Sequence, residues 1–171
     1  MTSEFIDAYS DDQIYLNMLE GLVNAHPIEA SVPDSIKYSS FSRLWAVMMV
    51  GGVECMIKEW TASRPSLSDI YAYFQDGSND KRLERLENAF KFRGLPVDSE
   101  AFQDYLAIKY IQNAYIHAEW SASQRSFVAA RGFPNDIMHF DATLFERMKN
   151  CYLHVMNNLG MANALESMRA P

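Results

Sequence analysis

Residues 99–120 are apolar on almost every side when they are drawn as a helix. The apolar side chains are Phe102, Tyr105, Leu106, Ile108, Ile111, Tyr115 and Ile116. A helix of this kind is unsuited to the protein surface, because water would meet hydrocarbon on nearly every face. The segment therefore predicts a largely buried central helix that other helices surround, with Asp98 or Ser99 as its N-cap.

The rest of the chain supplies candidates for the surrounding helices. Helical spacing predicts further main helices at about residues 11–24, 40–62, 80–92 and 141–160, and short helices at about 66–74 and 121–130. Prolines and turn-forming residues predict connectors at 26–38 and 76–80. No alternating strand pattern is longer than a few residues. The sequence thus predicts an all-α fold, an antiparallel helical bundle of four to five main helices plus short helices.

A chain of 171 residues is long enough for one domain with a substantial core. We expect a single domain over residues 1–171 with ragged ends at 1–10 and 161–171. Gly51 and Gly52 lie inside a predicted helix, where each costs about 1 kcal/mol relative to alanine. Such a pair indicates the close approach of another backbone, either from a crossing helix of the same chain or across a subunit interface.

Charge and cysteine content bear on which partners and which cellular compartment we expect for the protein. The formal net charge is −7 and the isoelectric point is about 5.0, which disfavours non-specific nucleic-acid binding but leaves a local cationic cleft open. Cys55 and Cys151 lie in apolar helical stretches and are expected to be buried thiols in a reducing compartment. The acidic N-terminus lacks a basic signal region, and the apolar run 44–53 is too short to span a bilayer. We expect a cytoplasmic protein with no membrane contact.

Metal and cofactor chemistry have little support in the sequence. A metal site in a bundle needs Glu-x-x-His pairs from facing helices, and none occurs. His139 and Asp141 have a ligand-like gap, but Asp141 is the predicted N-cap of the last helix. Cys55 and Cys151 have no base nearby in the sequence, and glycine-rich phosphate loops and dinucleotide fingerprints are missing. We therefore expect no metal and no cofactor.

Lys109, Asn113 and His117 follow one another at intervals of four residues. This spacing puts them on one stripe of the central helix, about 40° apart around its axis. Polar groups on a buried helix need partners, so the stripe predicts either an internal hydrogen-bonded network or a wet cleft. A lone histidine on such a helix is equally well explained as a satisfied core residue.

The functional interpretation assigns acid–base chemistry to His117. Its imidazole can accept a proton near neutral pH, Asn113 can orient the ring, and Lys109 or Arg125 can place a cation nearby. A cation there can stabilise an anionic phosphorane. Together these groups form a minimal set for metal-independent RNA cleavage, in which the 2′-hydroxyl is the nucleophile.

The run Gln112-Asn113-Ala114-Tyr115-Ile116-His117 resembles the motif of the HEPN domains (higher eukaryotes and prokaryotes nucleotide-binding). That motif has an Arg, a polar residue that is often Asn, three further residues and a His, late in a long helix. The order of elements is also similar, since a helix containing Trp45 and Glu54 precedes the motif and a last helix follows a variable loop. The resemblance implies an all-α bundle that forms a homodimer with two motifs in a shared cleft.

Many HEPN proteins are metal-independent endoribonucleases of defence or toxin–antitoxin systems, whereas others only bind. Position by position, His117 matches the catalytic His and Asn113 the polar residue, while Gln112 occupies the Arg position. Glutamine cannot neutralise a phosphate, so cleavage requires a substitute cation, with Lys109 the first candidate and Arg125 the next. The alternative is a catalytically inactive dimer that acts through a protein partner, and a plain bundle that binds a small ligand in its core is a third interpretation.

Overall fold

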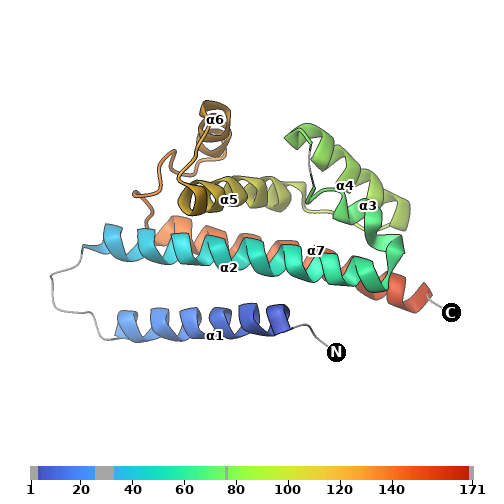
Figure 1. Cartoon of the computed structure of the whole chain (residues 1–171), viewed down its shortest axis with the longest axis horizontal. Coiled ribbons are helices and arrows are strands. Elements are labelled where there is room, and N and C mark those ends of the chain that lie inside the picture. The colour runs from blue at the N-terminus through green and yellow to red at the C-terminus, as the bar shows by residue number, and fades with distance from the viewer. Residues whose placement is uncertain (1–3, 26–32, 76, 170–171) are drawn as a thin grey trace. The chain divides into compact units, whose positions relative to one another are not determined.

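The computed structural model describes residues 4–25, 33–75 and 77–169. Its elements in chain order are α1 (Glu4–Ala25), α2 (Asp34–Ser63), the 3-10 helix η1 (Pro65–Leu67), α3 (Ser68–Tyr71), α4 (Asn79–Arg93), α5 (Ser99–His117), α6 (Ala122–Ala130) and α7 (Ala142–Arg169) (Figure 1). Within these ranges every regular element is a helix. The predicted all-α helical bundle is confirmed.

The first two helices are longer than predicted. Helix α1 begins at Glu4 rather than near residue 11, so the prediction of a ragged segment at 1–10 is wrong for residues 4–10. Helix α2 includes residues 34–38 of the predicted connector and begins directly after Pro33. The Pro33 carbonyl accepts hydrogen bonds from the amides of Ile36 and Lys37. Proline suits the start of a helix, where its missing N–H costs nothing. The rest of that connector, residues 26–32, and residue 76 of the next one lie outside the described residues.

Helix α7 also exceeds its prediction, since it continues through Gly160 to Arg169. Side chains beyond the glycine form hydrogen bonds with distant parts of the chain. The Arg64 guanidinium donates to Asn163 Oδ1 at 2.8 Å, and Arg93 Nε donates to Glu166 Oε1 at 2.8 Å. Tertiary contacts therefore outweigh the weak tendency of Gly160 to end the helix.

The chain folds into two compact units, residues 1–52 with 107–149 (unit 1) and residues 53–106 with 150–171 (unit 2). In unit 1 the Phe145 ring of α7 is the centre of an aromatic cluster. Its centroid lies 5.7 Å from that of Phe41 and 6.0 Å from that of Trp45, both on α2. All three side chains are buried.

The glycine pair of α2 is explained by Tyr9 of α1, which lies beside α2 in unit 1 (Figure 1). A Cβ built on Gly51 would lie 2.5 Å from Tyr9 Oη, and one on Gly52 would lie 3.4 Å from Tyr9 Cβ. The close approach thus comes from a helix of the same chain, as one of the two interpretations expected. The approaching group is a side chain, however, and not the expected backbone.

Unit 2 is built around a buried arginine, Arg93 at the end of α4. Its guanidinium binds both carboxylate oxygens of Asp69 at 2.7 and 2.9 Å and Glu166 at 2.8 Å, and it donates to the Ser66 and Ala89 carbonyls. A buried guanidinium needs this set of acceptors, because each unpaired N–H would cost free energy. The network holds η1, α3, α4 and α7 to one another.

Two sequence-based expectations about apolar segments need revision. Cys151 is a buried free thiol as expected, but Cys55 is only half-buried. Helix α2 is long and apolar enough to cross a membrane by length and composition alone, and 56% of its apolar 18-residue stretch is buried within the protein. The core helix of a soluble protein passes the same test.

Candidate functional site at the end of helix α5

Helix α5 ends at His117, about three residues earlier than predicted. Ala118 adopts a left-handed conformation with φ 54°, which is typical of the residue that follows a helix C-terminus. Ser121 then starts α6 with a capping box: its Oγ accepts from the Gln124 amide at 3.2 Å, and its own amide donates to Gln124 Oε1 at 3.0 Å. Two helices therefore meet across a short turn that carries His117 at its edge.

His117 is exposed to solvent. The alternative of a satisfied core histidine is therefore wrong. Of the segment 99–120, which was expected to be largely buried, residues 101–114 are buried or half-buried, whereas Tyr115, Ile116 and His117 are exposed. The end of α5 is thus a solvent-facing surface and not a core.

The other predicted residues of the stripe lie further back along α5. Lys109, Gln112 and Asn113 are half-buried, and Lys109 already interacts with other groups of the protein. Asn113 precedes His117 by one turn on the same stripe, as predicted. Gln112 lies about 140° around the helix from His117, so the two side chains leave α5 in different directions.

Arg125 is exposed on α6 and lies over an aromatic ring. Its guanidinium carbon is 5.1 Å from the ring of Trp120, in the turn between the helices. The Tyr110 ring of α5 meets the Phe127 ring of α6 edge to face at 5.8 Å and holds the two helices together. This packing brings Arg125 to the end of α5 that carries His117.

A second pair of the same kind was missed by sequence reasoning. The Arg43 guanidinium carbon of α2 lies 5.6 Å from the ring of Tyr115, which is 42% exposed. Arg43 is held in place because it donates to the Ile137 carbonyl at 2.7 Å. We call Arg43, Tyr115, His117, Trp120 and Arg125 the α5–α6 surface; all five belong to unit 1.

The local charge differs from that of the whole chain. Residues 107–131 contain Lys109, Arg125 and Arg131 but only one acidic residue, Glu119. The segment is therefore net cationic within a chain of formal charge −7. The overall acidic composition did not exclude a local cationic surface, and residues 107–131 are such a segment.

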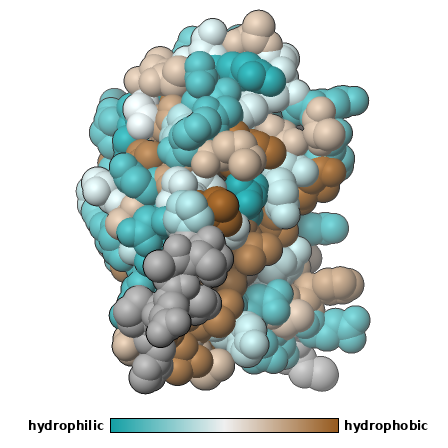
Figure 2. All heavy atoms as spheres, turned by 90° about the vertical axis from the view of Figure 1, so that its left-hand side faces the viewer, coloured by the Kyte–Doolittle hydropathy of each residue, from teal (hydrophilic) through white to brown (hydrophobic). Residues whose placement is uncertain are grey.

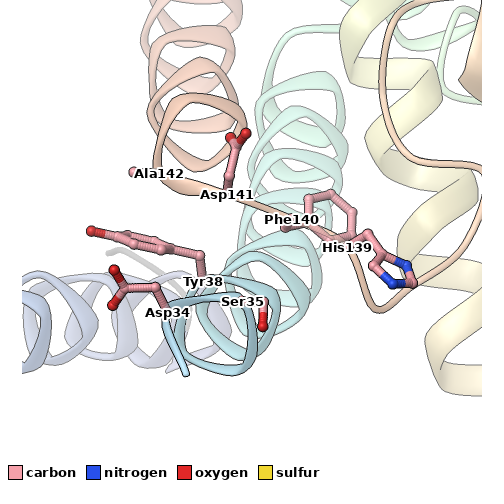
Figure 3. A pocket seen from close by; sticks show the side chains of 7 residues that line it. All are labelled: Asp34, Ser35, Tyr38, His139, Phe140, Asp141 and Ala142. Carbon is pink, nitrogen blue, oxygen red and sulfur yellow. The ribbon is translucent and has the colours of Figure 1, made fainter. Parts of the chain in front are cut away.

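A separate cavity of about 410 Å³ lies where α2 and α7 begin (Figure 3). It is lined by Asp34, Ser35, Tyr38, His139, Phe140, Asp141 and Ala142. Figure 3 shows the His139 imidazole pointing away from Tyr38 and Asp34. Figure 2 faces this end of unit 1 and shows hydrophobic residues exposed among hydrophilic ones. None of the five predicted site residues lines the cavity.

The polar groups around this cavity already have structural roles. Asp141 Oδ1 accepts from the Leu144 amide at 2.8 Å and so caps α7, as predicted. His139 Nδ1 lies 2.8 Å from Asp136 Oδ2. Partial burial raises the pKa of Asp136, but hydrogen bonds from the Met138 and His139 amides and from the His139 imidazole outweigh it and hold that pKa below its usual value. Among the described residues no three His, Cys, Asp or Glu side chains are grouped as a metal site requires.

Comparisons with protein-family models, with curated proteins and with solved structures give no match. The resemblance to HEPN domains therefore stays a prediction, and the site is argued from its own residues.

Proposed function

We propose that this protein binds single-stranded RNA through the α5–α6 surface. The observation that carries the proposal is that two exposed or half-exposed aromatic rings near the exposed His117 each lie beside a guanidinium: Tyr115 beside Arg43, and Trp120 beside Arg125. Unpaired bases stack on aromatic and guanidinium planes, while the cations neutralise phosphates. This combination is typical of surfaces that bind single strands.

Single-stranded RNA suits this surface better than a duplex. A duplex buries its base faces, so it would leave the aromatic rings without partners and rely on phosphate contacts alone. The chain is acidic overall and would repel a long polyanion outside a local cationic surface. We therefore expect binding to a short segment of RNA that weakens as salt is added.

His117 suggests a second candidate function, metal-independent endoribonuclease activity of the kind found in defence or toxin–antitoxin systems. The exposure of His117 supports it, because the imidazole is free of core packing. In the proposed step the 2′-oxygen bonds to phosphorus and the bond from phosphorus to the 5′-oxygen breaks. His117 accepts the 2′-hydroxyl proton, and the imidazolium so formed donates that proton to the leaving 5′-oxygen. The products are a 2′,3′-cyclic phosphate and a 5′-hydroxyl.

The cation for that step is the weak point of the ribonuclease proposal. Gln112 carries no charge, Lys109 is already engaged within the protein, and the Arg125 guanidinium lies over Trp120. We therefore expect binding to be the main activity and cleavage to be slow. The homodimer that the family resemblance implies would put a second copy of the motif, with its His117, in a shared cleft.

Binding can be measured by fluorescence anisotropy with a labelled oligouridine, with Trp120→Ala and Arg125→Gln as site variants. Loss of one stacking platform should weaken binding by about 5- to 100-fold. Arg85→Gln, which removes an exposed arginine of α4 in unit 2, is the matched control and should bind normally. Equal affinity of all four proteins would refute the proposal.

Cleavage is measured on the same RNA in the presence of a metal chelator. His117→Ala should abolish any cleavage, and Gln112→Arg should increase it if the motif position works as the resemblance implies. Full cleavage by His117→Ala would exclude the ribonuclease assignment and leave the binding proposal intact.

A further inference from the structure

Helix α1 carries apolar residues on two opposite sides. The side facing the rest of unit 1 holds the half-buried Ile6, Tyr9, Leu16, Leu19 and Val23. The opposite side holds Ile14, Tyr15, Met18 and Leu22, each more than half exposed. A surface helix normally has one apolar stripe, and a second stripe left in water is unfavourable. The composition of this outer side is therefore typical of a surface that a binding partner covers.

The same outer side is acidic in its first half. Glu4, Asp7 and Asp11 precede Ile14, Met18 and Leu22 at intervals of three or four residues, so all six lie within about 80° of one another around the helix. We call these six residues the outer seam. Helix α1 has five acidic residues and no basic one, and the three on the seam are exposed. The seam is thus anionic over its N-terminal half and apolar over its C-terminal half.

The inner side fixes the direction in which the seam faces. Tyr9 fits against Gly51 and Gly52 of α2, where a side chain would collide with it. Near the other end, Lys149 of α7 lies 3.0 and 3.1 Å from the two carboxylate oxygens of Glu20. Contacts near both ends thus hold α1 to unit 1, and the seam is a preformed surface.

We propose that the outer seam binds an amphipathic helix of another protein, apolar in its N-terminal half and rich in Lys or Arg in its C-terminal half. Docked antiparallel, such a helix places its apolar residues on Met18 and Leu22 and its cations beside Glu4, Asp7 and Asp11. Lys and Arg at a helix C-terminus are also favoured by the helix dipole.

The charge pattern argues against other occupants. In a second copy of α1, parallel pairing would bring like carboxylates together, and full antiparallel pairing would set carboxylates against hydrocarbon. An anionic membrane surface and RNA would both be repelled by the acidic half. A basic amphipathic helix is the occupant that matches both halves of the seam.

The test uses the full chain and two labelled synthetic helical peptides of about 21 residues, or three heptads. Both have leucine at the core positions of the N-terminal half; one has lysine and the other glutamate in the C-terminal half. The lysine peptide should bind, more weakly at about 200 mM than at about 50 mM salt, and the glutamate peptide should not. Failure of the lysine peptide to bind, or equal binding of both, would overturn the proposal.

Variants place the peptide on the seam. Met18→Lys and Asp11→Lys should each weaken binding at least about tenfold, because each sets a cation against the cationic or apolar half of the peptide. Asn17→Lys adds the same charge as Met18→Lys, at an exposed position of α1 off the seam, and should bind normally. Circular dichroism checks that all three remain folded, and all three should bind oligouridine as the wild type does. A dimer that Met18→Lys abolishes and Asn17→Lys does not would instead assign the seam to a second copy.

Discussion

The guanidinium of Arg125 lies 5.1 Å from the indole ring of Trp120, across the turn at which α5 gives way to α6. This contact puts a cation and a stacking surface near the exposed His117, at the C-terminal end of α5. Because the pair is at the surface, it contributes only about 0.5–1 kcal/mol to stability. Its main consequence is for binding, since a base can stack on Trp120 while the neighbouring Arg125 binds a phosphate.

The left-handed backbone at Ala118 predicts how a glycine there changes the free energy of unfolding. Glycine adopts φ near 54° without the steric cost that alanine incurs, so Ala118→Gly should raise the free energy of unfolding by about 0.5–1 kcal/mol. Ala129→Gly, at an exposed position inside α6, is the matched control and should lower it by a similar amount. Urea denaturation measures both. Destabilisation by Ala118→Gly would show that α5 continues beyond His117 in solution.

The packing of Tyr9 on Gly51 predicts an unusual effect of alanine in a helix. Gly51→Ala should destabilise the protein by about 1 kcal/mol or more, because the new Cβ collides with the tyrosine ring. Gly21→Ala in α1, where nothing lies within 4 Å of the new Cβ, should stabilise it by up to about 1 kcal/mol. A double-mutant cycle with Tyr9→Ala should show that Gly51→Ala becomes harmless once the ring is gone. Equal effects of Gly51→Ala with and without Tyr9 would contradict the contact.

Removing the buried guanidinium of Arg93 should be among the most damaging single changes. Arg93→Met leaves Asp69 and Glu166 without their shared partner, and we expect a loss of about 3–5 kcal/mol in the free energy of unfolding. Arg169→Met removes a half-exposed arginine 3.8 Å from Glu166 and should cost less than about 1 kcal/mol. Chemical denaturation of the two variants gives the comparison, and similar losses would show that the Arg93 network is not buried in solution.

Asp98 should contribute to the pH dependence of stability. A hydrogen bond with His154 Nδ1, at 2.6 Å, and one from the Ala101 amide lower the pKa of its carboxyl below the usual value of 3.8. A lowered pKa in the folded state stabilises the protein above the unfolded-state pKa, and that stabilisation is lost as the pH falls through the folded-state pKa. Asp98→Asn should therefore lose stability at neutral pH and show a flatter decline below about pH 4. Parallel pH profiles for wild type and variant would refute this role.

Local patterns predicted the helices well where each pattern matches a structural cause. The N-cap of α5 is Asp98, one of its two predicted candidates, and that of α7 is the predicted Asp141, because a short carboxylate before an apolar stretch accepts the first free amides of a helix. The predicted start of α1 near Asp11 was wrong, because α1 begins at Glu4 and Asp11 lies on the exposed side of the helix. Nothing local marks Ala118 as the end of α5, because alanine is the strongest helix former. Gly160 does not stop α7, because contacts with distant residues hold the helix beyond it.

The candidate site was only partly accessible from sequence. The stripe of Lys109, Asn113 and His117 follows from spacing alone, and Arg125 lies near enough in the chain to be suspected. The pairing of Arg43 with Tyr115 depends on how α2 packs against α5, which no local spacing encodes. Exposure of His117 depends on where α5 ends, and the predicted end near Trp120 was about three residues too late.

The most direct measurement is to locate bound RNA on the protein. An oligouridine containing 4-thiouridine is crosslinked to the full chain by ultraviolet light, and the modified peptides are identified by mass spectrometry. The RNA-binding proposal predicts crosslinks within residues 115–125, with a yield that Trp120→Ala sharply reduces and Arg85→Gln does not. Crosslinks elsewhere in the chain, or none at a protein concentration that saturates the anisotropy signal, would contradict it.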